Sequence, residues 1–444
     1  MSGTASQITA EPGGDPITGS AVYPLGSTVN DAGHLEIGGC DAVELAREFG
    51  TPAYIYAPDD IRARARAYGE AFAAHAVDHE IVYASKAAPI TAVLRLLEEE
   101  GLSVDVASGG ELHTAIGAGF DPARVYMHGN NKSVAELRAA FDAPIGALVV
   151  DSHDEIHLAD SLLARLTPRS SGQDVLLRLT PGIRPSTHSK VQTGQVDSKF
   201  GVGIGGGDAA RAVDAIQRSR HLNLVGFHAH IGSQILDLEP YVRAIEALAE
   251  FARPYETEVL NVGGGLGIAY LQGDEPPSAK EYVDVKVEGI KRLFDPVPKI
   301  VIEPGRSLVG NAGVTLYTVG TVKEIPGVRT YVAVDGGMSD NLRPMLYGSR
   351  YEALIANRAG EPPTDRVTIA GKHCESGDVL IEDAIVASPK SGDVLVTPAT
   401  GAYGAAMANN YNGVPRPPIV FCSNGDARTV VRRETFEDLT ARDV

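Results

Sequence analysis

The sequence predicts an α/β protein, with a closed (β/α)8 TIM barrel followed by a mostly antiparallel β domain. Strand-like apolar runs alternate with runs of helical spacing over about 230 residues, as expected of consecutive βα units. From about Val309 the pattern changes to short β-type runs separated by Gly, Pro and Asp. An open doubly wound sheet is the competing fold. The barrel is favoured because no GxGxxG motif follows the first strand and polar residues end nearly every strand.

The predicted barrel elements follow one another along the chain. Apolar runs typical of buried parallel strands lie at residues 81–85, 103–107, 125–128, 147–151, 175–180, 224–229, 258–262 and 299–303. Helical spacing is found between them at residues 89–100, 110–119, 134–141, 155–166, 209–218 and 239–251. The β domain is expected to use strands at 314–322, 330–334, 367–370, 381–387 and 393–397.

These patterns divide the chain into four parts. Residues 1–18 are rich in Gly, Ser, Thr and Pro, and we expect a disordered tail there. Residues 19–50 contain one apolar-periodic run, 42–49, and are expected to pack with the β domain. The barrel is then expected over residues 51–309 and the β domain over residues 310–444.

Composition narrows the choice of partners. The 444 residues carry a formal net charge of −18, which argues against nucleic acid or an anionic membrane as the main partner. The three cysteines, Cys40, Cys374 and Cys422, are scattered and show no disulfide or zinc pattern. The first residues lack a signal-peptide layout, and no apolar run approaches ~20 residues. We therefore expect a cytoplasmic protein with a small-molecule substrate, bound by local Arg and Lys if that substrate is anionic.

A lysine ends the first predicted barrel strand. Lys86 follows the apolar run 81–85 and precedes a helical run, so it faces the loops where parallel α/β folds bind ligands. Partial burial there would disfavour the ammonium form and free a nucleophile for Schiff-base chemistry. The alternative is a solvated lysine at a strand-to-helix turn, and this stretch alone does not exclude it.

Two further strand ends carry titratable groups. Asp105 ends the second strand as either a polar residue of the barrel interior or a neighbour of a cofactor, while Glu111 fits a capping box with Ser108. His228 and His230 are two residues apart in the sixth strand and therefore face the barrel axis together. They could bind a metal, although no third ligand has convincing spacing, or an imidazole could lie against a flat aromatic ligand.

The last two strand ends predict an anion site. Gly263–Gly265 follow the seventh strand, where glycines let backbone N–H groups approach a phosphate, although a plain turn is the alternative. Glu303 and Arg306 end the eighth strand. They could pair with each other, or Glu303 could accept a protonated ring nitrogen while Arg306 binds an oxyanion.

The β domain adds a second group of candidates. Cys374 is either a small buried hydrophobe or, since charged residues and glycine flank it, a surface or cleft thiol available for proton transfer. Arg343 and Tyr347 share a face if their stretch is helical. Tyr403 and Tyr411 lie in glycine-rich loops as core aromatics or as ligand contacts.

These motifs together resemble a known family. The chain resembles the pyridoxal-phosphate-dependent decarboxylases with an alanine-racemase-like barrel, and among them the diaminopimelate decarboxylases. Ornithine and arginine decarboxylases share YAxK and HxGS, but they differ at CESGD, at HGNNK and around Arg343. The matching motifs are YASKA at 83–87, DVASGGEL at 105–112, HGNNKS at 128–133, THxKVxTG at 187–194, SKFG at 198–201, HIGSQ at 230–234, GGGLG at 263–267, EPGR at 303–306, CESGD at 374–378 and GAYG at 401–404.

The resemblance implies pyridoxal 5'-phosphate as cofactor, no metal, and conversion of meso-2,6-diaminopimelate to L-lysine and carbon dioxide by a homodimer. Lys86 would carry the cofactor as a Schiff base, His230 would stack on its ring, and Cys374 of the second subunit would reprotonate the product. The implied cofactor contacts are Lys86, Asp105, His230, Ser233, Gly264, Gly265, Glu303, Gly305, Arg306 and Tyr403. The implied substrate contacts are Arg306, Arg343, Tyr347, Glu375 and Tyr403. Whether Tyr403 or Tyr411 contacts the phosphate stays open.

Three rival functions remain at this stage. An ornithine- or arginine-type decarboxylase of the same fold would act on substrates without a distal carboxylate, which leaves Arg343 without a ligand. A degenerate homologue that binds a partner or the cofactor, but does no chemistry, would need neither Lys86 nor Cys374. A racemase of this fold would use a tyrosine as its second base, where this sequence has Cys374.

Overall fold

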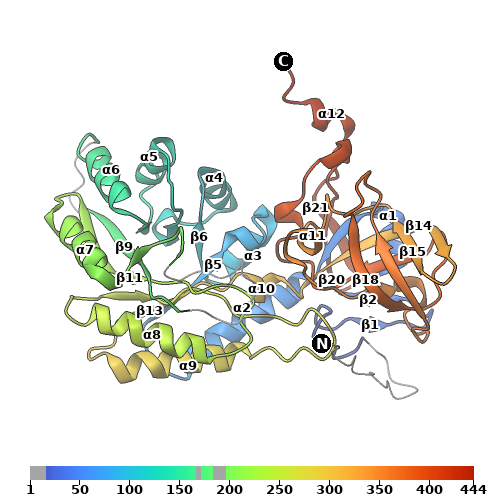
Figure 1. The fold of residues 1–444 in the computed structure, drawn as a ribbon, viewed down its shortest axis with the longest axis horizontal. Coiled ribbons are helices and arrows are strands. Elements are labelled where there is room, and N and C mark those ends of the chain that lie inside the picture. Colours follow the sequence, from blue (N-terminus) through green and yellow to red (C-terminus); the bar gives the residue numbers. More distant parts are fainter. Residues whose placement is uncertain (1–16, 167–171, 184–196) are drawn as a thin grey trace.

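The computed structural model describes residues 17–166, 172–183 and 197–444. It contains a barrel and a second β-rich body lying side by side (Figure 1). The expected tail falls largely within residues 1–16, and the THxKVxTG motif at 187–194 falls within 184–196, so both lie outside the described residues.

The barrel is confirmed. Its eight strands are all parallel and pair in chain order, and β13 returns to β5 to close the cylinder. β10 (Val202–Gly203) adds a short pairing to β9. Apolar side chains from the strands, such as Val82, Val149 and Leu176, form one buried cluster, as in the packed interior of such barrels. The strands are β5 (His79–Ala84), β6 (Ser103–Val106), β7 (Val125–Met127), β8 (Ala147–Val150), β9 (Gln173–Thr180), β11 (Leu222–His228), β12 (Val259–Asn261) and β13 (Lys299–Ile302).

Helices cover the outside of the barrel (Figure 1). Because α10 (Arg306–Val309) is a single turn, the ring is completed by α2 (Pro58–Ala73), which precedes β5 and packs against α9 and α3. The sequence analysis named neither α2 nor α9. Among the described residues no helix is long and apolar enough to cross a membrane. The other helices are α3 (Thr91–Glu99), α4 (Gly109–Ala118), α5 (Val134–Asp142), α6 (His153–Leu163), α7 (Asp208–Arg218), α8 (Glu239–Ala252) and α9 (Ala279–Leu293).

The second body is a mixed sheet in the order β18-β17-β15-β14-β4-β20-β21, with β19 on β14 and β16 on β19. Most pairings are antiparallel, whereas β15–β17 and β4–β20 are parallel. A one-turn helix, α11 (Arg343–Tyr347), follows β15, and α12 (Phe436–Thr440) lies near the C-terminus. The strands are β4 (Ala53–Tyr56), β14 (Gly313–Ile325), β15 (Arg329–Val334), β16 (Leu354–Ile355), β17 (Asp365–Ala370), β18 (Val379–Val386), β19 (Val394–Thr397), β20 (Ile419–Ser423) and β21 (Asp426–Val431).

One expected boundary is corrected by this sheet. The sequence analysis began the barrel at residue 51, but β4 pairs with β14 and β20 and so belongs to the second body. Its four buried residues look like a barrel strand in sequence, and its pairing partners lie more than 250 residues further along the chain.

The N-terminal segment contributes a small sheet and a helix. β1 (Thr28–Val29), β2 (Leu35–Ile37) and β3 (Cys40–Asp41) pair in that order, and α1 (Ala42–Phe49) follows. The Asp41 side chain caps the first turn of α1, and Gly50 ends the helix with a positive φ of 69°. Apolar residues of this segment are buried in one cluster with residues of β14, β19 and β20.

Candidate active site

A cavity of about 290 Å³ lies where the barrel strands end and the second body begins. The strand ends supply most of its polar lining, and α11 and the loop around Tyr403 supply the rest. Its titratable, polar and glycine lining residues include Lys86, Asp105, His128, Arg178, His228, His230, Ser233, Gly265, Glu303, Gly305, Arg306, Arg343, Tyr347 and Tyr403. The structure therefore brings together most of the candidates that the sequence identified.

Lys86 lies directly after β5 in a 3-10 turn, Ser85–Ala87, and lines the cavity. Burial lowers the pKa of its amine, but Asp105, Tyr403 and Glu303 act in the opposite direction, and the net shift is upward. Burial disfavours the ammonium form, as the sequence predicted, but the acidic neighbours that the fold brings close outweigh it, so the net direction is opposite to the predicted one.

Asp105 follows Lys86 around the barrel mouth. Burial raises the pKa of its carboxyl well above the ordinary value, and the nearby Glu303 carboxylate raises it further. Lys86 and Arg178 oppose this shift. The charges of Lys86 and Asp105 therefore influence each other's pKa within one cavity wall.

Glu303 is held by three side chains. Its Oε1 lies 2.9 Å from His128 Nε2 and accepts a hydrogen bond from Asn261 Nδ2 at 2.7 Å. Its Oε2 lies 3.0 Å from His228 Nε2. Burial opposes ionisation, but the two histidines hold the pKa of Glu303 well below its usual value. Glu303 is therefore a fixed negative charge in the cavity wall.

The two histidines that hold Glu303 are neutral at pH 7. Burial lowers the pKa of His128 and lowers that of His228 to about 4. The ligand atoms of His128, His228 and Glu303 lie within 4.8 Å of one another, a spacing that a metal ion could use. His228 Nε2 is hydrogen-bonded to Oε2 and His128 Nε2 lies 2.9 Å from Oε1, so these three side chains form a polar cluster that orients Glu303.

The glycine turn after β12 allows a close approach of backbone segments. Gly263 and Gly265 have φ values of 62° and 113°, in the region that favours glycine. A Cβ on Gly264 would lie 2.0 Å from the Glu303 carbonyl oxygen, and one on Gly305 would lie 2.9 Å from Ala84 Cβ. The N–H of Gly264 donates to His230 Nδ1 at 3.3 Å. The turn is thus packed directly against the His230 ring and the end of β13.

Arg306 does not use Glu303 as its partner. Its Nε and Nη2 donate to Ser233 Oγ at 3.3 and 2.9 Å, and its Nη1 donates to Tyr270 Oη. The guanidinium also lies 4.7 Å from the centre of the Tyr403 ring. This settles one alternative from the sequence, because Glu303 pairs with histidines and Arg306 pairs with hydroxyl groups.

The second body closes the cavity with α11. Arg343 and Tyr347 share one face of this helix, as expected, and both line the cavity. Arg343 donates to Tyr351 Oη and lies 4.8 Å from the centre of the Tyr270 ring. Burial raises the pKa of Tyr270, but Arg306 and Arg343 reverse that effect and the net shift is downward. Two guanidiniums thus converge on one tyrosine and make this wall positive.

Tyr403 and Cys374 lie in different places. Tyr403 lines the cavity, has a φ of 62° and donates its N–H to the Ala87 carbonyl at 2.8 Å, directly beside Lys86. Cys374 is exposed, as is Glu375, and neither belongs to the cavity lining of its own chain. Tyr411 is exposed and its ring lies 5.7 Å from that of His373, next to Cys374.

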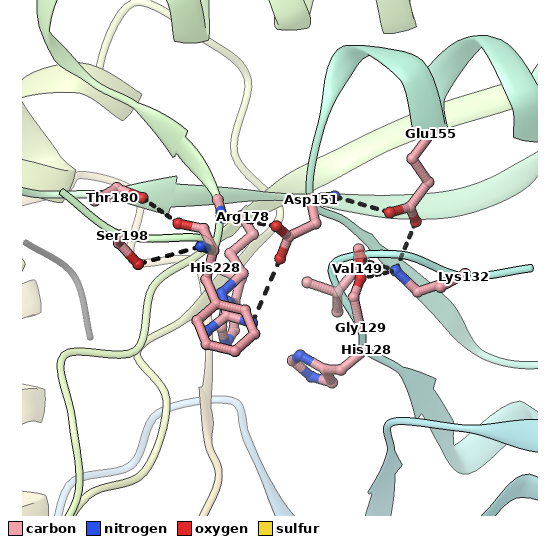
Figure 2. Close-up of polar contacts among 12 residues, drawn as sticks. His128, Gly129, Lys132, Val149, Asp151, Glu155, Arg178, Thr180, Ser198 and His228 are labelled. Carbon is pink, nitrogen blue, oxygen red and sulfur yellow. Dashed lines mark hydrogen bonds and ion pairs between the residues drawn. The ribbon is translucent and has the colours of Figure 1, made fainter. Parts of the chain in front are cut away.

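Lys132 of the HGNNKS motif forms a buried support behind the cavity (Figure 2). Lys132 Nζ donates to the carbonyls of Gly129 and Val149, both at 2.8 Å, and to Glu155 Oε1 at 2.6 Å. Ser133 and Glu136 form a capping box that starts α5. The motif therefore fixes the turn at Gly129, which lines the cavity beside His128.

Arg178 projects into the cavity from the end of β9. Its Nη1 lies 3.5 Å from Asp151 Oδ2, and its guanidinium lies 4.5 Å from the centre of the Phe200 ring. The other oxygen of Asp151 accepts the N–H of Gly201 at 2.7 Å. The sequence analysis did not identify Arg178, Asn261 or Tyr270, and it included His128 only as part of the HGNNKS motif; the position of Arg178 at a strand end was the signal that could have found it.

Comparisons with known proteins define the class. The model of the pyridoxal binding domain of pyridoxal-dependent decarboxylases matches residues 58–310, which span α2 to α10. The barrel and its lysine-centred cavity are those of a pyridoxal-dependent decarboxylase.

Comparisons over the full chain are more specific. The diaminopimelate decarboxylase of Bacillus subtilis is 52% identical over 94% of this chain and 97% of its own length. That of Mycobacterium tuberculosis is 40% identical over 95% and 98%. The solved structure of the M. jannaschii diaminopimelate decarboxylase with L-lysine has a TM-score of 0.87 at 35% identity, covering 94% of this chain and 97% of that one. The chain belongs to the diaminopimelate decarboxylase family.

Proposed function

We propose that this protein removes one carboxylate from meso-2,6-diaminopimelate, with pyridoxal 5'-phosphate as cofactor, and yields L-lysine and carbon dioxide, the last step of lysine biosynthesis. The observation that carries the proposal is the convergence of Lys86, Glu303 and Arg343 on one cavity, in a chain 52% identical to a diaminopimelate decarboxylase. A cytoplasmic location is part of the proposal and agrees with a biosynthetic role.

The residues present fit the cofactor. A phosphate needs a backbone cradle, and Gly265 and Gly305 line the cavity with backbone that carries no side chain. An aldehyde needs an amine, which Lys86 provides. When bound, pyridoxal phosphate supplies a ring that delocalises the electron pair left by departing carbon dioxide.

We assign the cofactor contacts as follows. Lys86 would hold the aldehyde end, with Asp105 beside it, and His230 would lie against one face of the ring. Glu303, kept ionised by His128 and His228, would hold a proton on the ring nitrogen, because a fixed carboxylate favours the cation. The phosphate would be held by Ser233, Gly265, Gly305, Arg306 and Tyr403, while Gly264, the remaining predicted contact, would act through His230, to which its N–H donates.

The substrate contacts lie on the side of the second body. Arg343 and Tyr347 of α11, together with Arg306, would bind the distal carboxylate in the positive wall around Tyr270. Glu375 would bind the distal amine, and Cys374 would return a proton to the carbon that has lost its carboxylate. Because Cys374 and Glu375 are exposed and outside the cavity of their own chain, we propose that both come from the second subunit of a homodimer.

The first experiment tests the cofactor. The purified protein should show a visible absorbance that borohydride removes and that Lys86→Ala lacks. Lys280→Ala is the matched control, because Lys280 is an exposed lysine of α9 that pairs with Asp284. A protein that stays colourless with added pyridoxal phosphate would favour a non-catalytic homologue.

The second experiment tests the substrate. Turnover of meso-diaminopimelate should exceed turnover of ornithine and arginine. Only diaminopimelate carries a second, distal carboxylate, which would pair with Arg343. A lysine/ornithine decarboxylase from Vibrio vulnificus, at 22% identity and a TM-score of 0.73, shares the fold. Preference for ornithine over diaminopimelate would place this chain with that activity and refute the proposal.

A further inference from the structure

A fully buried lysine lies under the glycine turn and takes no part in the chemistry above. Lys286 comes from the outer helix α9 and is 0% exposed. Its Nζ donates to the carbonyls of Val262 and Gly263 at 2.9 and 3.0 Å and lies 2.5 Å from Tyr282 Oη. Removing an amine from water costs free energy, so a fully buried lysine with several hydrogen-bond partners suggests a specific role.

Aromatic rings enclose the amine. Nζ lies 4.0 Å from the centre of the Tyr282 ring and 4.8 Å from that of Tyr241. Tyr282 Oη itself donates to the Gly263 carbonyl at 3.0 Å. Burial lowers the pKa of Lys286, but an ammonium and a neutral amine both have enough N–H groups for the two carbonyls. The hydrogen bonds from Lys286 to the Val262 and Gly263 carbonyls can therefore form whether its amine is charged or neutral.

One peptide group connects Lys286 to the cavity. The Gly263 carbonyl and the Gly264 N–H belong to the same planar trans peptide and point in opposite directions. The carbonyl accepts from Lys286 and Tyr282 on the α9 side, and the N–H donates to His230 Nδ1 at 3.3 Å on the cavity side. The N–H of Glu303 also donates to the Gly263 carbonyl, at 3.1 Å. Since glycines give the turn no side chains, the two side-chain donors of α9 and this backbone bond together fix the peptide plane.

We propose that Lys286 is a positioning residue: through the Gly263–Gly264 peptide it keeps His230 in the neutral tautomer that carries its hydrogen on Nε2. A nitrogen that accepts a hydrogen bond carries no proton, so Nδ1 is unprotonated as long as Gly264 donates to it. Burial lowers the pKa of His230 in the same sense. The proposal rests on the proposed function in one respect: a neutral His230 can lie against a protonated cofactor ring without charge repulsion.

The tautomer of His230 is measurable by 15N NMR of histidine-labelled protein, with its signal assigned by its loss in His230→Asn. The unsubstituted protein and the control Lys280→Met should show an unprotonated Nδ1. Lys286→Met should show a mixture of tautomers, and its Kd for pyridoxal phosphate should rise by about tenfold or more, as when other supporting contacts of a site are lost. A folded Lys286→Met protein with the unsubstituted His230 signal would overturn the proposal.

A second variant covers the case in which Lys286→Met fails to fold. Tyr282→Phe keeps the ring but removes the hydroxyl that contacts both Lys286 and the Gly263 carbonyl, and it should shift the His230 signal toward the same mixture. An unchanged signal in Tyr282→Phe overturns the proposal in that case. Because the tautomer can be recorded in cofactor-free protein, a protein that binds no pyridoxal phosphate refutes the proposed function and still tests this inference.

Discussion

Lys132→Met is expected to destabilise the protein by about 3–5 kcal/mol, the range found when one partner of a buried ion pair is removed. The side chains of Lys132 and Glu155 are 1% and 5% exposed, so water cannot replace the lost partner. The substitution also removes the two hydrogen bonds to the Gly129 and Val149 carbonyls. Glu155 then remains as a buried carboxylate without its cation.

The loss of stability in Lys132→Met should change with pH in a defined direction. Burial raises the pKa of Glu155 in the folded protein even with Lys132 opposing it, and without Lys132 that pKa rises further. A carboxyl group whose folded-state pKa lies above its unfolded value of about 4.3 costs stability as pH rises, by about 1.4 kcal/mol per pH unit up to the folded-state pKa. The deficit of Lys132→Met should therefore be smallest in acid and largest at neutral pH.

Denaturant unfolding at pH 5 and pH 8 measures the stability deficit of Lys132→Met at each pH. A double-mutant cycle with Glu155 is the critical comparison. Glu155→Gln removes the stranded charge, so Lys132→Met/Glu155→Gln should be more stable at pH 8 than Lys132→Met alone. Lys280→Met is the matched control on an exposed pair and should change stability by less than about 0.5 kcal/mol. A double variant no more stable than Lys132→Met, or a deficit that shrinks as pH rises, would refute the reasoning.

Three further outcomes are expected at the cavity. Arg343→Ala should raise the KM for diaminopimelate by about 30-fold or more, from a loss of about 2–5 kcal/mol, and an unchanged KM would exclude Arg343 as the carboxylate ligand. Lys86→Ala and Cys374→Ala should each be inactive, yet an equal mixture should recover about a quarter of the activity through mixed two-fold dimers; no recovery would place both residues in one chain's site. Glu303→Gln should lower stability at pH 7, and the difference should begin to shrink as pH falls below about 4.3, the unfolded value of a Glu carboxyl, and should disappear only below the lower pKa that Glu303 has in the folded protein. A difference that stays constant in denaturant unfolding as the pH is lowered from 5 into this acid range would contradict this.

The barrel could be predicted because its strands are uniform apolar runs ended by polar residues. Position at a strand end placed Lys86, Asp105 and Glu303 at one rim, since parallel strands share a direction. The role of β4 could not be read in the same way. Its partner β14 begins at Gly313, and pairing at such sequence separation leaves no local pattern.

The partners inside the site were harder to predict than its members. Asn261 and His128 contact Glu303 only because the barrel closes with a particular stagger. For Lys86, burial was foreseeable, but the acidic groups of Asp105 and Glu303, which reverse the effect of burial on its pKa, are brought close only by the fold. Sequence therefore predicted which groups gather, and the structure was needed for the balance of charges among them.

The pairing of β4 with β14 has a mechanical consequence. The chain enters the barrel just after Tyr56 and leaves it just before Gly313, and these two residues are directly paired. The barrel is thus joined to the second body by two chain connections that lie side by side. Rotation of the barrel about one connection would strain the other, so hinge motion between the two bodies is restrained. Arg343 and Tyr403 are thereby kept in fixed register with Lys86, and substrate entry should proceed by side-chain and loop movement rather than by opening of the two bodies.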